Sequence, residues 1–260
     1  MFPSAGLSGK RMAYPDDSEA RRLDVEMVRR GLSPSRAQAR AAIEAGLVTV
    51  DGTVAVKPGQ VVRDAAAIVA EAAHPWASRG GVKLAHALDV FGVDPAERAC
   101  LDVGASTGGF TDVLLARGAR RVVAVDVGRG QLVARLTADA RVVSLEATDA
   151  RSLTVEMIGE APSLVVCDAS FIGLAKVLPI ALDLAARGAE LVALFKPQFE
   201  VGRANIGKGG IVSDNAAVDA AAAELEAWLT ARSWSPPQWT NSPIAGGDGN
   251  RERLLLSRKI

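Results

Sequence analysis

The 260-residue sequence has few cysteines and few aromatic side chains. It contains two cysteines, and Phe, Trp and Tyr together make up 4% of the residues. Cys100 and Cys167 each lie inside an apolar run, so we expect both to be small core residues in a reducing compartment. This placement argues against a disulfide or a cysteine metal site, and we expect no bound metal.

The sequence also lacks targeting and membrane signals. No charged-then-apolar segment opens it, and no uncharged run approaches the ~18 residues needed to span a bilayer. Apolar residues make up 49%, enough for a substantial core. Lys plus Arg and Asp plus Glu number 30 each, so the net charge identifies no partner. We expect a soluble cytoplasmic protein that does not contact membranes.

Composition and pattern divide the chain into four segments. Residues 1–20 are polar and small without periodicity, which predicts a disordered tail. Residues 21–72 predict a compact α+β unit, 73–78 a linker around Pro75, and 79–260 a large α/β domain.

The small unit reads as two helices followed by a hairpin. Ser33 is the expected N-cap of the second helix, with Pro34 in its first turn. Asp51-Gly52 predicts the hairpin turn. Between residues 21 and 63 the chain has eight Lys or Arg against four Asp or Glu. The unit is therefore basic although the whole chain is neutral.

The large domain is organised around a glycine-rich loop between an apolar run and a helical pattern. Its glycines read Gly104-x-x-x-Gly108-Gly109. A Walker loop would need Gly-Lys-Ser/Thr and a dinucleotide loop Gly-x-Gly-x-x-Gly, and neither is present. An Asp-x-Gly strand end, here Asp102-Val-Gly104, with a second acid at the next strand end, Asp126, is typical of S-adenosylmethionine (SAM) methyltransferases.

Apolar runs alternate with helical patterns through the rest of this domain, which predicts a mostly parallel sheet buried on both faces. Ligands then bind beyond the carboxyl ends of the strands. Asp126, Asp168 and Lys196 all fall at that edge. Residues 173–188 predict a helix, the glycine-rich segment 202–213 a mobile loop at the site, and 239–242 with 254–257 a final antiparallel pair.

Two resemblances follow from these motifs. The two helices and hairpin with arginines resemble the alpha-L RNA-binding motif. The loop 104–110, Asp126-Val-Gly128-x-Gly130, Asp168-x-Ser170-Phe171 and the run Lys196-Pro-Gln-Phe-Glu200 together closely resemble the TlyA family, often labelled haemolysin A. Its members are ribosomal RNA 2'-O-methyltransferases of the FtsJ/RrmJ-like superfamily. The match runs from about residue 21 to the last residue.

The resemblance implies a Rossmann-like, seven-stranded SAM-dependent methyltransferase fold and assigns candidate residues. The superfamily's Lys-Asp-Lys-Glu tetrad falls on Lys83, Asp168, Lys196 and Glu252. The expected cofactor contacts are Asp102, Gly104, Ala105, Ser106, Thr107, Gly108, Gly109, Phe110, Asp126, Val127, Asp149 and Asp168. The expected RNA contacts are Arg21, Arg22, Arg36, Arg40, Lys57 and Arg79, because cations at these positions would meet phosphates.

Two positions depart from the family pattern. Relatives often carry Asn where this chain has Asp149 and an aromatic residue where it has Arg129. Lys83 lies in the first turn of a helix, where a lysine by itself is typical of a solvated surface. Neither departure touches the tetrad, and only the resemblance draws Lys83 into a site.

The tetrad suits the chemistry that the resemblance implies. A ribose 2'-hydroxyl is a weak nucleophile, so the protein must orient it and accept its proton. A free lysine, with a pKa of ~10.4, is protonated at neutral pH, but a nearby cation and partial desolvation lower a lysine's pKa. We therefore expect Lys196 to be the base and Lys83 its neighbouring cation. Asp168 would orient Lys196, and Glu252 would hold Lys83 or the ribose.

Other functions remain open at this point. The acid after the second strand also suits a dinucleotide oxidoreductase, although the glycine spacing opposes it. The family's old label suggests a membrane-lytic toxin, for which no spanning or strongly amphipathic cationic segment is found. An RNA-binding module with an inactive enzyme domain is a further alternative. The resemblance implies cytidine in ribosomal RNA, with the large subunit favoured over the small one, and leaves the oligomeric state open.

Overall fold

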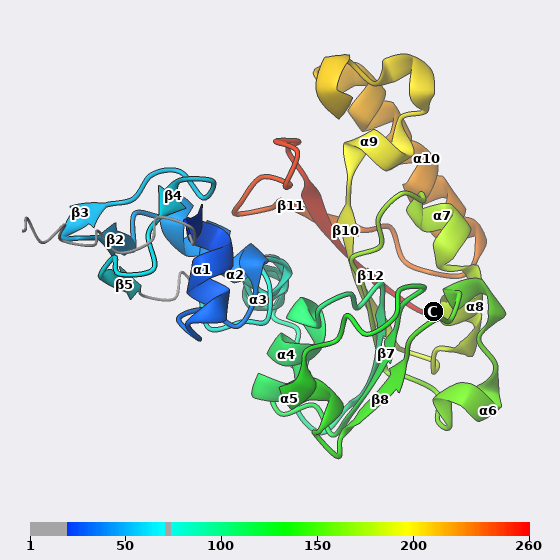
Figure 1. The fold of residues 1–260 in the computed structure, drawn as a ribbon. Coiled ribbons are helices and arrows are strands. Elements are labelled where there is room, and N and C mark those ends of the chain that lie inside the picture. Colours follow the sequence, from blue (N-terminus) through cyan, green and yellow to red (C-terminus); the bar gives the residue numbers. More distant parts are fainter. Residues whose placement is uncertain (1–19, 71–73) are drawn as a thin grey trace, which may run out of the picture. The chain divides into compact units, whose positions relative to one another are not determined.

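The computed structural model describes residues 20–70 and 74–260. The chain divides into two compact units, residues 1–73 and 74–260, which are described separately (Figure 1). The predicted tail lies outside the described residues except for Ala20, and so does the start of the predicted linker.

The first unit packs two helices against short strands. Leu23 and Met27 of the first helix and Ile43 of the second are fully buried and meet Val48 of the hairpin in one core. One sheet pairs β1 with β4, and the other has the order β3-β2-β5, antiparallel throughout. The elements are α1 (Leu23–Arg29), α2 (Arg36–Glu44), β1 (Arg21–Arg22), β2 (Val48–Val50), β3 (Thr53–Val54), β4 (Val61–Val62) and β5 (Ile68–Ala70).

The predicted hairpin is confirmed, since β2 and β3 flank Asp51 and Gly52, both with positive φ. The predicted helix cap is wrong by two residues. Ser35, not Ser33, is the N-cap of α2, and its Oγ accepts a hydrogen bond from the Gln38 amide at 3.3 Å. A seryl cap needs extended backbone, and Ser35 has φ −154° and ψ 158°.

The second unit is built on a seven-stranded sheet with the order β11-β12-β10-β9-β6-β7-β8. Strands β10, β9, β6, β7 and β8 run parallel, and β12 is antiparallel to both of its neighbours. This confirms the mostly parallel sheet and its final antiparallel pair. The strands are β6 (Ala99–Val103), β7 (Arg121–Val125), β8 (Val142–Leu145), β9 (Leu164–Cys167), β10 (Glu190–Phe195), β11 (Gln238–Asn241) and β12 (Arg253–Arg258).

Helices cover both faces of this sheet (Figure 1). One apolar cluster joins α3, α4 and α5 to one face, and a second joins α6, α7, α8 and α10 to the other. The helices are α3 (Gly80–Phe91), α4 (Gly109–Ala116), α5 (Ala134–Thr137), α6 (Val155–Ile158), α7 (Leu174–Val177), α8 (Pro179–Leu184), α9 (Pro197–Glu200) and α10 (Asn215–Ala231).

The predicted helix over 173–188 is two helices instead. Pro179 starts α8, because proline lacks the amide that would continue the ladder from α7. The glycine-rich segment 202–213 holds two short 3-10 turns, Arg203–Asn205 and Lys208–Gly210, and its mobility stays a prediction.

Both cysteines are buried in the second unit and neither forms a disulfide. Burial raises the pKa of each thiol to about 12, as expected of core residues. Among the described residues, no helix has the length and apolar character needed to cross a membrane.

Candidate active site

The glycine loop leaves the carboxyl end of β6 and approaches the neighbouring strand's exit closely. Gly104 has φ +83°, and a Cβ there would lie 2.8 Å from the Ala169 Cα atom. Only glycine fits both the space and the backbone conformation. Gly108, with φ +97°, is the N-cap of α4. The loop therefore places the start of α4 beside the ends of β6 and β9.

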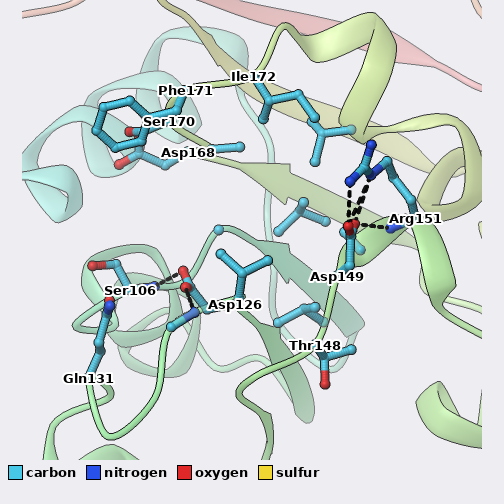
Figure 2. A pocket seen from close by; sticks show the side chains of 18 residues that line it. Ser106, Asp126, Gln131, Thr148, Asp149, Arg151, Asp168, Ser170, Phe171 and Ile172 are labelled. Atoms are coloured by element: carbon cyan, nitrogen blue, oxygen red, sulfur yellow. Dashed lines mark hydrogen bonds and ion pairs between the residues drawn. The ribbon is translucent and has the colours of Figure 1, made fainter.

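Asp126 ties this loop to the one that follows β7. Its carboxylate accepts hydrogen bonds from the Ser106 amide at 2.8 Å and the Gly128 amide at 2.7 Å (Figure 2). Glu146 then holds the far side of the second loop, accepting from the amides of Gly130, Gln131 and Leu132 at 2.9, 2.6 and 3.1 Å. These backbone hydrogen bonds lower the pKa of Glu146.

A cavity of about 610 Å³ opens at the carboxyl ends of these strands. Figure 2 shows Ser106, Asp126 and Gln131 on one side of it and Ser170, Phe171 and Ile172 on another. The predicted cofactor residues that line the cavity are Gly104, Ser106, Asp126, Val127, Asp149 and Asp168. The lining residues that the sequence prediction missed are Val103, Val125, Gly128, Gln131, Thr148, Ala150, Arg151, Ala169, Ser170, Phe171, Ile172 and Val177.

The remaining predicted cofactor residues lie outside the cavity wall. Asp102, which precedes the loop, is buried, and so are Ala105, Gly108, Gly109 and Phe110 within it. Thr107 is half-buried and also does not line the cavity.

Asp102 is the most unusual of these supporting residues. Its side chain is 0% exposed, and Oδ2 accepts a hydrogen bond from Thr111 Oγ1 at 2.7 Å. Oδ1 has no hydrogen-bond partner within the described part of the chain. Burial raises the pKa of this carboxyl to about 7, because the charged form is poorly solvated there.

Asp149, one of the two family departures, is engaged by a neighbour that the sequence did not single out. Arg151 donates to its carboxylate through Nη2 at 2.6 Å and through Nε at 3.0 Å (Figure 2). This pairing lowers the pKa of Asp149. The charge of Asp149 is therefore compensated inside the cavity by a second lining residue.

The four tetrad residues come together as two ion pairs next to the cavity. Lys196, at the end of β10, lies 2.7 Å from Asp168 Oδ1 after β9, and its Nζ donates to Ser170 Oγ at 2.8 Å. Lys83, from the first turn of α3, donates to Glu252, which precedes β12. All four come from different elements of the second unit.

Both lysines of this cluster are buried, at 7% exposure for Lys83 and 8% for Lys196. Burial raises the pKa of Glu252, while the charges of Lys83 and Lys196 oppose that rise and the charge of Asp168 adds to it. The two ion pairs are therefore within electrostatic reach of one another. Because Glu252 pairs with Lys83, the positive charge expected beside Lys196 is largely compensated.

The predicted RNA contacts divide between the two units. Arg22 and Arg36 both donate to Asp24, and Arg40 lies 3.7 Å from Glu44. Lys57 is exposed beside the turn at Pro58. The remaining two are Arg21, 4.0 Å from Glu26, and Arg79, the N-cap of α3 in the second unit.

Comparison with known proteins decides the family. The model for FtsJ-like methyltransferases matches residues 76–259, and the S4 domain model matches 21–68. The chain is 48% identical to the 16S/23S rRNA (cytidine-2'-O)-methyltransferase TlyA of Mycobacterium tuberculosis H37Rv, covering 91% of this chain and 89% of that protein. The chain belongs to the TlyA family of FtsJ-like methyltransferases. This membership confirms the family expected from the motifs and favours a methyltransferase over a dinucleotide oxidoreductase.

A further relative and two solved structures extend the comparison. Hemolysin A of Brachyspira hyodysenteriae is 38% identical over 90% of this chain and 98% of that protein. A solved structure from Streptococcus thermophilus, whose assignment as a hemolysin is provisional, has a TM-score of 0.74 at 39% identity and covers 92% of this chain and 88% of that one. A methyltransferase structure from Listeria monocytogenes shares the fold alone, with a TM-score of 0.53 at 13% identity over 70% of this chain and 99% of that one.

Proposed function

We propose that this TlyA-family protein transfers a methyl group from SAM to the ribose 2'-hydroxyl of a cytidine in ribosomal RNA. The observation that carries the proposal is the buried lysine–carboxylate cluster beside the cavity. The named activities of the M. tuberculosis relative, at 48% identity, and of the Campylobacter jejuni 23S rRNA (cytidine-2'-O)-methyltransferase TlyA, at 37%, support the choice of reaction and nucleotide.

The cavity suits SAM in size and lining. A volume of about 610 Å³ lies within the range of ~300–1,000 Å³ typical of ligand pockets. The Asp126 carboxylate would accept ribose hydroxyls, since each of its oxygens keeps a lone pair beyond its amide partner. Asp149 would accept from the adenine amino group, and Ile172 and Val177 offer apolar contact. When bound, SAM supplies an electrophilic methyl group on a sulfonium.

The residues of the cluster then divide the remaining work. In the reactive form, after release of its own proton, Lys196 would accept the proton of the 2'-hydroxyl as the oxygen attacks, which restores the ammonium that pairs with Asp168 at 2.7 Å. Ser170 Oγ would fix the direction of the Lys196 amine. Glu252 holds Lys83 in place, and Lys83 would in turn orient the ribose.

A methyl-transfer assay tests the proposal. Labelled SAM is incubated with deproteinised small-subunit and large-subunit ribosomal RNA and with the assembled subunits. A ribose 2'-O-methyl group blocks alkaline cleavage at its nucleotide, so label should appear in alkali-resistant dinucleotides that contain cytidine. Label in a base, or in no RNA while calorimetry detects SAM binding, would refute the proposed reaction.

The base assignment is tested with matched variants. Lys196→Ala should abolish transfer and leave the Kd for SAM within a few-fold. Lys176→Ala removes an exposed lysine of α7 and should retain activity. Substantial methylation by Lys196→Ala would remove Lys196 from the role of base.

The same assay resolves the subunit. The sequence favoured the large subunit, but the relative named as a 16S/23S enzyme is more similar, at 48%, than the relative named as a 23S enzyme, at 37%. The identities therefore lend no support to a large-subunit restriction, and both RNAs belong in the first experiment.

A further inference from the structure

The first unit, called unit 1 below, contains a buried carboxylate that accepts hydrogen bonds from two exposed arginines. Asp24 has 0% exposure, whereas the side chains of Arg22 and Arg36 are 52% and 60% exposed. Arg22 donates through Nε at 2.9 Å and Nη2 at 3.0 Å, and Arg36 donates through Nη2 at 3.1 Å. One hidden acid thus joins the first helix to the start of the second.

The pairing leaves both guanidiniums with donors to spare. A guanidinium has five N–H groups, and Asp24 takes two from Arg22 and one from Arg36. The remaining N–H groups of each guanidinium belong to a side chain that is about half exposed. Two such forks, fixed on one carboxylate, match the oxygens of a phosphate group.

A neighbouring acid shows the contrasting, structural use of arginine. Glu26 is also buried, at 1% exposure, and Arg30 donates to it. Arg30 is only 21% exposed, and its other nitrogens donate to the backbone carbonyls of Ala66, Arg63 and Asp64. That arginine fastens the chain before β5 to α1. The pair on Asp24 makes no such backbone contacts in the described residues.

We propose that Asp24 is a positioning residue for a two-arginine phosphate site, in which Arg22 and Arg36 grip one backbone phosphate of the RNA substrate. The inference rests on the proposed function for the identity of that RNA. It would account for a fully buried acid beside two exposed arginines of this basic unit. The ionised form is maintained because Arg22 and Arg36 lower the pKa of Asp24 to about 2.

The proposal predicts a change in RNA affinity opposite to the one expected from net charge. Asp24→Asn removes one negative charge from a basic unit, so long-range electrostatics alone predicts equal or tighter RNA binding. If Asp24 holds the two forks in register, the same change weakens binding. We expect the Kd for ribosomal RNA to rise about tenfold and the slope of log K against log salt to fall in magnitude by about one.

The test measures RNA binding directly, by filter binding of the full chain to deproteinised ribosomal RNA over a salt series. Glu44→Gln is the matched control, since it also removes one acid beside an arginine but leaves Asp24 in place. It should bind as the wild type does or slightly tighter. Calorimetry with SAM should give an unchanged Kd for every variant, because the cavity lies in the other unit.

A background variant separates positioning from a merely structural role. In Arg22→Ala/Arg36→Ala the further change Asp24→Asn should cost no additional RNA affinity. An equal loss in that background, or unweakened binding by Asp24→Asn alone, would overturn the proposal.

Two further outcomes are distinguishable. If Asp24→Asn loses the circular dichroism of unit 1, Arg22→Lys/Arg36→Lys replaces it, because this variant keeps both charges and the acid but removes the forks. The proposal then expects about a fivefold loss of affinity, and no loss would refute it. Wild-type protein that binds RNA without methylating it would refute the proposed function and leave this inference intact. Absence of RNA binding by the wild type would overturn the inference.

Discussion

Replacing Asp102 with asparagine should stabilise the second unit in a pH-dependent way. The residue is fully buried under the glycine loop, with a pKa raised by burial to about 7 from an ordinary value of about 3.9. The folded protein therefore binds a proton here that the unfolded chain has released. The stability that this bound proton gives the folded state is full below pH ~4, declines as pH rises, and is lost above the folded pKa of Asp102.

The size of the effect follows from the interval between the two pKa values. Each pH unit between them changes the free energy of unfolding by about 1.4 kcal/mol. Between pH 5 and pH 7 this amounts to about 3 kcal/mol, and above pH 8 the curve is flat. The introduced asparagine would carry no charge at any pH and can still accept the hydrogen bond from Thr111. The advantage of Asp102→Asn over wild type should therefore grow by about 3 kcal/mol between pH 5 and pH 8.5.

The four tryptophans make the measurement specific. Trp76, Trp228, Trp234 and Trp239 all belong to the second unit, so tryptophan fluorescence in urea reports the unfolding of that unit alone. Asp219→Asn, at a side chain that is 65% exposed, is the control and should show no such growth. A difference between Asp102→Asn and wild type that stays constant from pH 5 to pH 8.5 would refute the assignment of a raised pKa.

Three further changes test the loops and unit 1. Gly104→Ala places a Cβ 2.8 Å from the Ala169 Cα atom at φ +83°, so calorimetry should show SAM affinity reduced at least tenfold and urea unfolding should show a loss of about 1–3 kcal/mol. Glu146→Ala removes the acceptor of three loop amides and should weaken SAM binding severalfold without changing RNA binding, whereas Glu146→Gln, which keeps one acceptor oxygen, should retain most of it. Arginine partners lower the pKa of Asp24 and Glu26 to about 2, so the stability that these ion pairs give the first unit is present above pH ~4.5 and lost as pH falls towards 2. Circular dichroism should show the first unit unfolding across that window, and Glu26→Gln should make its stability less dependent on pH.

The main elements of the large unit could be predicted because their signals are local. Strands buried on both faces are continuous apolar runs, and glycines with positive φ, such as Gly92 after α3, end helices. The failures are also local in cause. Pro179 divides a pattern that is apolar throughout, and β1 and β4 are two-residue strands, too short for any periodicity.

The site was predicted only in part, because its pairings are long-range. The acids at strand ends locate the cavity, since parallel strands present their carboxyl ends at one edge. The partner of Lys83 lies 169 positions away, and only the packing of α3 near β12 brings the two together. The lining residue Phe171, 92% exposed with φ +67°, gives no periodic signal, although it closely follows the strand-end acid Asp168.

The arrangement of the tetrad as two pairs bears on how a proton leaves the substrate. Each lysine has its own acid, so the cluster is neutral as a whole, and neutrality limits the cost of burying four charges. The pairs differ in access. Asp168 lines the cavity with 23% of its side chain exposed, whereas Glu252 keeps 3%. The Lys196–Asp168 pair is therefore the one in contact with the cavity, and the Lys83–Glu252 pair is more enclosed. This difference supports the proposal that Lys196 accepts the proton and that Lys83 orients the ribose.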